Sequence, residues 1–288
     1  MQTSKEVSAL LSLIDDPDDE IFETVSEKII GYGSNILPSL ETLWEISPDR
    51  EIQQRIELII HRLQLSELTE EFKQWVNSDQ QDLLTGVLLV CKYENHSISK
   101  PSVTEVLEKM KRNIWLELNN YLTPLEELNI IVSILFNYYK IKTDSIYPKK
   151  INTYLLDKLL ESKEGNQLSN GILILILAEM LDLPIKAIQN PDQFLLAYFK
   201  SDINLESNSS FQYELDFYLD PKCGTIFSKK NLISYLTRVS LLPKPPFLKP
   251  ASNVEIIQRL MLALIVCYAE DKQEIKKKEL RDLANLLG

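Results

Sequence analysis

The sequence predicts an α+β protein that is mostly α-helical, with a small antiparallel sheet in its second half. Apolar residues recur at helical spacing over most of residues 1–181, and the period falls to nearly two between residues 185 and 219. Helical spacing returns in residues 253–287. The chain also has only 7 Gly among 288 residues, whereas phosphate-binding turns and tight hairpins depend on Gly. Rossmann folds, P-loop enzymes and β-rich folds are therefore disfavoured.

Residues 1–120 are predicted to form a helical domain that contains a partial repeat. Pro17–Ile21 recurs as Pro48–Ile52, about 31 residues later, and the apolar positions that follow recur in the same register. Helical pairs with a period of about 30–45 residues are typical of a HEAT-like solenoid, in which neighbouring pairs bury their apolar faces against each other. Two capped amphipathic helices with similar first turns would give the same pattern. Further helices are expected over roughly 66–78, 80–93 and 101–120.

Residues 121–241 are predicted to form a core of helices and strands. Helices are expected at 124–140, 151–161 and 169–181, and the last is apolar nearly all round, as a central buried helix is. Three strands are expected, at 185–188, 193–199 and 211–219. They are rich in β-branched and aromatic residues, and the turn clusters 190–192 and 207–210 separate them. They predict a short antiparallel sheet of three or four strands.

Residues 242–288 are predicted to form a third region. Its proline-rich start, Leu242–Pro250, cannot be a helix or a central strand, so we expect an extended linker. Two helices, at about 253–269 and 272–287, are expected to form a helical hairpin.

Charge and cysteine content restrict the partners and the compartment. The net charge of −11 disfavours binding to nucleic acid or anionic membranes. The N-terminus lacks signal-peptide features, and the longest apolar run, Ile172–Ala178, is far shorter than the ~20 residues that span a bilayer. Cys91, Cys223 and Cys267 are odd in number and widely spaced, which favours reduced thiols over a disulfide framework or a zinc site. We therefore expect a cytoplasmic protein without a cofactor.

The central segment has the layout of a papain-like or transglutaminase-like core. A buried helix begins near Gly165–Ser169, one strand begins at Gln193, and another ends at Leu219–Pro221. In such cores a nucleophile lies at a helix N-terminus, where the helix dipole lowers its pKa. A base and the carboxylate that orients it come from two adjacent strands.

Several segments in order resemble the SirB-type bacterial proteins of the transglutaminase-like superfamily. The opening LLSLIDDPDDEIFETVSEKIIGYGSNILPSLETLWE and Asp82–Gly86 are similar to that family. INTYLLDKLLESKEGNQLSNGILILILAEMLDLP resembles its asparagine-led helix and Gly-x-Pro-x-Ser helix start, and NPDQFLLAY resembles its Pro-Gly-His-Phe-Leu strand. Leu219–Pro221 and SNVEIIQRLMLALIVCYAED complete a resemblance that runs over nearly the whole chain.

The resemblance implies a damaged catalytic triad. The superfamily's nucleophile, Cys in active transglutaminases, corresponds to Ser169, its base His corresponds to Gln193, and its acid corresponds to Asp220. A glutamine amide does not accept a proton at neutral pH, so nothing at that position activates the serine. Loss of a positioned base costs about 10²–10⁴ in rate. We therefore expect no triad chemistry.

Other residues offer weak substitutes, and each has a structural alternative. The two histidines, His61 and His96, lie in the helical half of the chain and are interpreted as a helix-face residue and a loop residue. Cys91 ends an apolar helix and is interpreted as a core residue. Cys223 follows a lysine in a predicted turn, which could lower its thiol pKa, although turn cysteines are usually inert. Ser169 itself has a structural alternative as a cap or first-turn residue.

These observations favour a catalytically degenerate protein that acts as a protein-interaction or regulatory module. Stacked helical pairs offer an extended surface to a protein or peptide, and the acidic charge favours a basic partner. The alternative is a hydrolase or acyltransferase with a non-standard nucleophile, Ser169 or Cys223. A third interpretation is a scaffold that binds a small molecule in the vestigial cleft.

Overall fold

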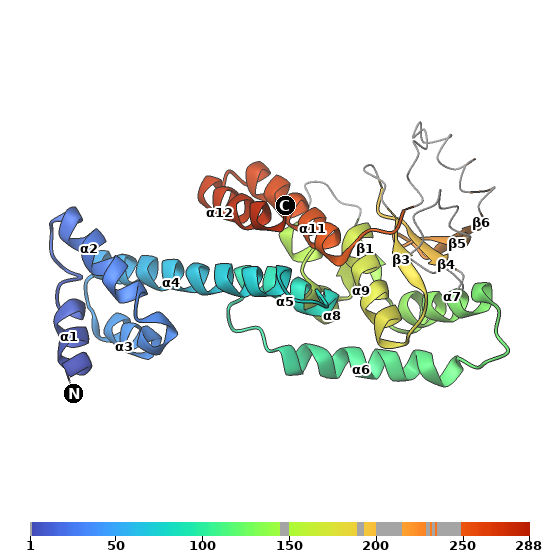
Figure 1. Ribbon diagram of the computed structural model, residues 1–288, viewed down its shortest axis with the longest axis horizontal. Helices are drawn as coiled ribbons and strands as arrows, with labels where there is room; N and C mark the ends of the chain where they lie inside the picture. The colour runs from blue at the N-terminus through green and yellow to red at the C-terminus, as the bar shows by residue number, and fades with distance from the viewer. Residues whose placement is uncertain are drawn as a thin grey trace. The chain divides into compact units, whose positions relative to one another are not determined.

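The protein consists of two compact units, Met1–Gln74 and Trp75–Gly288. The computed structural model describes residues 2–144, 150–188, 193–199, 215–228, 231, 234 and 249–288. It is mostly helical, with a small sheet in the second unit, in agreement with the predicted α+β class (Figure 1). Among these residues, none of the helices has both the length and the apolar character needed to cross a membrane.

The first unit is a cluster of helices around an apolar core. Its elements are α1 (Gln2–Leu11), α2 (Asp19–Ile30), the 3₁₀ turn η1 (Gly33–Ile36), α3 (Leu37–Ile46) and most of α4 (Arg50–Val76). The side chain of Asp18 caps α2 by accepting a hydrogen bond from the Glu20 N–H at 2.9 Å. The two repeated segments begin α2 and α4, which both interpretations of the repeat require. Val25 of α2 and Ile56 of α4, which correspond in the repeat, are both buried.

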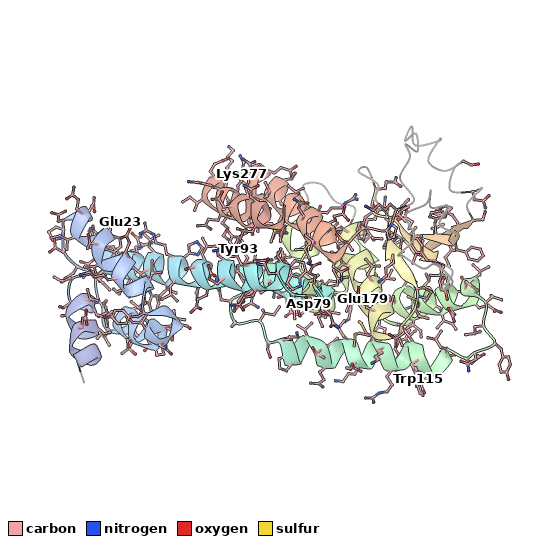
Figure 2. All side chains as sticks on the ribbon, in the orientation of Figure 1. Glu23, Asp79, Tyr93, Trp115, Glu179 and Lys277 are labelled. Carbon is pink, nitrogen blue, oxygen red and sulfur yellow. The ribbon has the colours of Figure 1, made fainter. Side chains whose placement is uncertain are left out.

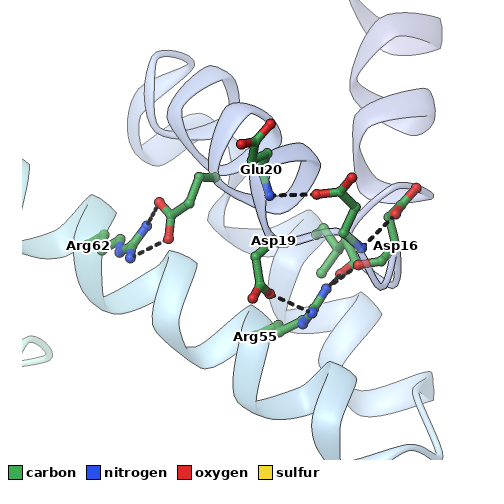
Figure 3. A network of polar contacts seen from close by, with 8 residues as sticks. Asp16, Asp19, Glu20, Arg55 and Arg62 are labelled. Carbon is green, nitrogen blue, oxygen red and sulfur yellow. Dashed lines mark hydrogen bonds and ion pairs between the residues drawn. The ribbon is translucent and has the colours of Figure 1, made fainter.

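Two arginines of α4 hold the start of α2 and the turn before it (Figure 3). Arg55 donates hydrogen bonds to the carbonyls of Ile14 and Asp16, and its guanidinium lies 4.8 Å from the centroid of the Phe22 ring. Arg62 binds both carboxylate oxygens of Glu23, at 2.6 and 3.0 Å. The backbone carbonyls of Ile14 and Asp16, in the turn before α2, thereby receive hydrogen bonds from a side chain of α4.

Helix α4 differs from its prediction. Separate helices were expected around residues 52–60 and 66–78, whereas Arg50–Val76 is one continuous helix of 27 residues. The reason is that this stretch contains neither Gly nor Pro, and the residues between the two predicted helices are good helix formers.

The second unit surrounds helix α9 (Gln167–Met180) with other helices. Every residue of α9 from Leu168 to Ala178 is buried, which confirms the prediction of a central core helix. Its neighbours include α6 (Lys100–Glu117) and α8 (Leu156–Ser162), and α8 in turn packs on α5 (Leu83–Glu94).

The C-terminal helices belong to the same unit. Helix α11 (Asn253–Glu270) packs along α12 (Glu274–Ala284), which ends in the 3₁₀ turn η4 (Asn285–Leu287), and α11 also packs on α5. A polar cluster joins these helices: Tyr93 donates to Glu279 at 2.8 Å, and Glu94 accepts hydrogen bonds from Tyr268 and, at 2.8 Å, from Lys276 (Figure 2).

These contacts account for the position of the boundary between the units. The two compact units divide between Gln74 and Trp75. The division into three domains, with boundaries after residues 120 and 241, stays a prediction. Helices α5 and α6 pack on the predicted core, and so does α11, so the helical segments on either side of that core are parts of one body.

The sheet has four antiparallel strands in the order β3-β4-β5-β6. They are β3 (Ile185–Ala187), β4 (Leu196–Phe199), β5 (Leu215–Asp220) and β6 (Thr225–Ser228). Strand β4 begins three residues later than predicted, and β6 was not among the predicted segments. The turn before β6 contains Gly224 at a φ of +72°, a conformation that favours glycine. A second sheet has only β1 (Lys142–Thr143) and β2 (Glu164–Gly165), which pair in parallel.

The helix predicted at 124–140 changes type along its length. It is an α-helix, α7, only from Pro124 to Val132, and it continues as the π-helix η2 over Ser133–Tyr138. The Tyr139 N–H accordingly donates to the Ile134 carbonyl, five residues earlier. Short π-helical segments are frequent at functional sites.

Some predicted segments lie outside the described residues. They are the turn clusters 190–192 and 207–210, the first part of the strand predicted at 211–219, and residues 242–248 of the proline-rich stretch. Pro250, at the end of that stretch, forms a bridge with Ile188 beside β3.

Candidate functional site

The N-terminus of α9 is held by a reciprocal pair of side-chain hydrogen bonds. The carboxamide oxygen of Asn166 accepts from the N–H groups of Leu168 and Ser169, at 2.9 and 3.0 Å. The Ser169 hydroxyl accepts in return from the Asn166 N–H at 2.9 Å. This arrangement is a capping box, which satisfies N–H groups that have no partner within the helix.

The same two residues tie the helix to the preceding 3₁₀ turn, η3 (Ile151–Thr153). Asn166 Nδ2 and the Ser169 hydroxyl both donate to the Thr153 carbonyl, at 3.0 and 2.7 Å. Ser169 is only 2% exposed. Within the described residues, its hydroxyl therefore has the structural role of a first-turn residue.

Gln167, the first residue of α9, connects the helix to two strand ends. Its Nε2 donates to Asp220 Oδ1 at 2.8 Å, and its Oε1 accepts a long hydrogen bond, 3.4 Å, from the Phe194 N–H. Asp220 ends β5, and its Oδ1 also accepts from the Lys222 N–H at 2.8 Å. The Asp220 residue is 4% exposed, so a nearly buried carboxylate oxygen has two donors.

Close packing beneath Gln167 fixes these distances. A Cβ added to Gly171 of α9 would lie 2.5 Å from the Phe194 ring and 3.0 Å from Pro221 Cγ. The glycine thus lets the helix approach both the start of β4 and the turn after β5. Beside Gly171, buried Asn170 donates from Nδ2 to the Thr143 hydroxyl at 3.0 Å and to the Pro221 carbonyl at 3.3 Å.

The structure brings together only part of the predicted triad. Asp220 and the segment that contains Gln193 both reach the N-terminus of α9, as expected, but the side chain that meets Asp220 is Gln167. Ser169, the predicted nucleophile position, binds Asn166 and Thr153 instead. Gln193 is half-buried and directly precedes Phe194, whose N–H faces Gln167. The assignment of the triad positions to Ser169, Gln193 and Asp220 remains a prediction.

The sequence contained a signal for Gln167 that the prediction did not use. In the Gly-x-Pro-x-Ser pattern, Gln167 stands at the proline position, between Asn166 and Ser169. Proline there would present no side-chain donor or acceptor, whereas glutamine presents both. Gln167 therefore departs from the pattern in an informative way, because it places a polar side chain at the start of a helix that faces two strand ends.

The cysteines and histidines lie where the sequence suggested. Cys91 is buried in α5, and burial raises the pKa of its thiol to about 12. Cys223 is exposed in the turn after β5, with its Sγ 2.9 Å from the Thr225 hydroxyl. His61 lies in α4 and His96 in the connection between α5 and α6.

A comparison with known protein families agrees with this geometry. The profile described as the transglutaminase-like superfamily matches residues 101–262, more than half of the chain. The chain belongs to the transglutaminase-like superfamily. The match covers α6, α9, the sheet and the first part of α11, so the Gln167–Asp220 contact lies inside the superfamily domain.

Among curated proteins, the UPF0162 protein YchA of Escherichia coli strain K12 is 22% identical over 195 residues, which are 66% of this chain and 68% of that protein. The YchA protein of Escherichia coli O157:H7 gives the same identity and coverage. No solved structure matches the chain significantly.

The superfamily domain also carries an exposed groove. A pocket of about 680 Å³ lies between the C-terminal half of α6 and the π-helix η2, and its lining includes Asn113, Leu116, Glu117, Ser133, Asn137 and Tyr138. Two apolar side chains of this lining are largely exposed, Leu116 by 66% and Tyr138 by 69%. Trp115, which precedes Leu116 in α6 and is labelled in Figure 2, is 63% exposed but does not belong to the lining. Such grouped exposure is typical of an interaction site.

Proposed function

We propose that this chain is a SirB-type member of the transglutaminase-like superfamily that lacks triad chemistry and acts by binding a protein or peptide. One observation carries the first half of this proposal. The buried Asp220 carboxylate accepts its hydrogen bond from the carboxamide of Gln167, where a working site needs an imidazole or thiolate within reach. A carboxamide is neither a base nor a nucleophile at neutral pH.

The groove beside α6 supports the second half. Its apolar side chains offer anchors for a partner, and aromatic residues are enriched among the residues that dominate binding energy. Glu117 in its lining is exposed and ends α6, whose last turn contains no basic residue. The negative end of the helix dipole adds to that charge. We therefore propose a partner segment with apolar side chains and at least one Lys or Arg.

The first unit and the compartment complete the proposal. Helices α2 and α4 begin with the repeated segments, and we propose that the unit is HEAT-like and offers a further surface to the same kind of partner. The cysteines are few and widely spaced, which favours reduced thiols and supports a cytoplasmic location.

The binding proposal is tested with the intact protein as bait in an extract of its own cells, followed by affinity measurement with the purified partner. We expect the double substitution Leu116→Ala and Tyr138→Ala to weaken binding about tenfold or more, because both side chains line the groove and buried anchors dominate interface energy. Ile275→Ala is the matched control, since Ile275 of α12 is 74% exposed and lies outside the groove lining. Equal loss in both variants, or a partner indifferent to both, contradicts the proposal.

The catalytic alternative is tested by mass spectrometry of the folded protein after treatment with an activated acyl ester. We expect no acyl adduct at Ser169. We also expect Cys223 to react with iodoacetamide as an ordinary exposed thiol, while buried Cys91, with its raised pKa, stays unmodified until unfolding. An acyl adduct that disappears in Ser169→Ala or Cys223→Ala and turns over with time would establish the alternative.

A further inference from the structure

A second pocket lies on the opposite end of α6 from the groove. Its volume is about 290 Å³, and it is formed by the connection between α5 and α6, the first half of α6, and α8. One part of its lining is apolar, with Val103, Val106 and Leu160. The remainder is polar and acidic, and it includes Ser97, Ser99, Ser102, Asp157 and Glu161.

Asp157 is the unusual member of this lining. The residue is 7% exposed, and neither of its carboxylate oxygens has a nitrogen or oxygen donor as a hydrogen-bond partner within the part of the chain that the structure describes. Buried carboxylates are normally paired or hydrogen-bonded, because transfer of an unpaired charge out of water is costly. The carboxylate is thus an acceptor with unused capacity that lines a cavity.

The groups beside Asp157 do not use that capacity. Lys158 Nζ lies 4.0 Å from Asp157 Oδ2, too far for a hydrogen bond, and the same ammonium lies 3.0 Å from Glu161 Oε2. The thiol of Cys91 is also close: burial, then the charge of Asp157, and also a hydrogen bond to the Asp157 side chain raise the pKa of this thiol. A thiol is only a weak donor.

We propose that this pocket binds an alkylammonium group, with the ammonium on Asp157 and the methylene chain against Val103, Val106 and Leu160. An ammonium has three donors and no acceptor, so it needs a carboxylate and further oxygens around it. The serine hydroxyls of the lining supply such oxygens. Lysine-like groups characteristically place their methylene stems along apolar surface and their charge on a polar group.

The chemistry favours an alkylammonium over a bare divalent cation. Hard cations such as Ca²⁺ take six or more oxygen ligands, often from several carboxylates. Here Glu161 is engaged by Lys158 and is largely exposed, which leaves Asp157 as the single buried carboxylate of the lining. The apolar wall also offers nothing to a hydrated ion, whereas it suits a hydrocarbon chain. The proposal is independent of whether the Gln167–Asp220 site is catalytic.

The test titrates the full, ¹⁵N-labelled chain with n-pentylammonium chloride and follows backbone amide shifts. We expect saturable shifts at Ser99, Val103, Val106 and Leu160, and none with n-pentanol at the same concentration, because the alcohol has the same chain but no charge. Shifts spread over the acidic surface without saturation, or equal shifts with pentanol, would overturn the proposal. The wild-type titration alone decides this, even if a variant fails to fold.

Two variants locate the charge. Asp157→Asn should weaken pentylammonium binding about tenfold or more, which corresponds to about 1.4 kcal/mol. It should leave thermal stability unchanged or raise it, because it removes a buried charge whose nearest ammonium is 4.0 Å away. Glu161→Gln is the matched control and should change affinity less than about twofold, since its carboxylate is exposed. Unchanged affinity in Asp157→Asn would refute the site.

The source of the ammonium is distinguished by a second probe, Nα-acetyl-lysine N-methylamide, at the same pocket. Tighter binding of this probe than of n-pentylammonium indicates a lysine side chain of a peptide. Weaker binding indicates a free amine, because the amide groups of the lysine probe then do not fit.

Discussion

The contact between Gln167 and Asp220 should be a measurable source of stability in the second unit. Asp220 Oδ1 has two donors, Gln167 Nε2 and the Lys222 N–H, each at 2.8 Å, and the residue is 4% exposed. Hydrogen bonds to charged groups contribute about 1.5–3 kcal/mol, and a buried acceptor that loses its donor incurs a desolvation penalty of similar size. We expect Gln167→Ala to lower the free energy of unfolding by about 2–3 kcal/mol.

A double-mutant cycle with Asp220→Ala isolates the pair, because alanine offers no acceptor to Gln167. The coupling energy between the two substitutions should be about 1.5–3 kcal/mol, because the residues touch directly. Urea unfolding followed by tryptophan fluorescence is the assay. It is carried out in a Trp44→Phe background, so that the remaining tryptophans, Trp75 and Trp115, report the second unit.

The control is a glutamine with a neutral acceptor. Gln81 Nε2 donates to the Val76 carbonyl at 2.9 Å in the same unit. Gln81→Ala should cost only about 0.5–1.5 kcal/mol, the usual net value for a neutral hydrogen bond. A coupling energy below about 0.5 kcal/mol, or a Gln167→Ala loss no larger than that of Gln81→Ala, would refute the reasoning from charge and burial.

Two further predictions concern the packing of α9 and the first unit. Gly171→Ala should lower the free energy of unfolding in urea by about 1–2 kcal/mol. The new Cβ would lie 2.5 Å from the Phe194 ring, and the cost of this overpacking exceeds the gain of about 1 kcal/mol in helix propensity. A net stabilisation would contradict the close approach of α9 to Phe194. Arg62 lowers the pKa of Glu23, so the pair stabilises the fold at neutral pH and this contribution disappears as the pH falls through the lowered pKa. Because both side chains are more than a third exposed, Arg62→Met should cost less than about 1 kcal/mol at pH 7 and progressively less as the pH falls through the lowered pKa, and a cost that does not change with pH would show that the arginine acts through packing.

Much of the fold could be predicted from the sequence because periodicity reports burial directly. The run Ile172–Ala178 is apolar at every position, and only a helix surrounded on all sides buries it. The continuity of α4 was missed because a break was assumed where apolar spacing weakened, although no Gly or Pro stands there. The extent of the compact units could not be predicted for a different reason. Packing between α5, α8 and α11 joins segments far apart in the sequence, and periodicity contains no information on such contacts.

The candidate site was predictable in place and not in detail. The order of a buried helix, a strand and a strand end predicted that these segments meet at the start of α9, where Gln167 contacts Asp220 and the Phe194 N–H; the triad assignment itself stays a prediction. Which side chain of the first helical turn faces the strands depends on rotation of the helix about its axis. That rotation is fixed by contacts such as Gly171 against Phe194, which the local sequence does not reveal.

This geometry also gives Asp220 a structural explanation that needs no catalysis. Its carboxylate lies at the N-terminus of α9, where the helix dipole favours negative charge, and it receives Gln167 from the helix and the Lys222 N–H from the turn after β5. The same Asp220 accepts the Gly224 N–H on its carbonyl at 3.0 Å, which closes that turn. An aspartate with these three contacts joins helix, strand and turn whether or not a nucleophile is present. Its presence is therefore not itself a sign of activity, and the proposal of lost triad chemistry rests on the partner opposite it, the Gln167 amide.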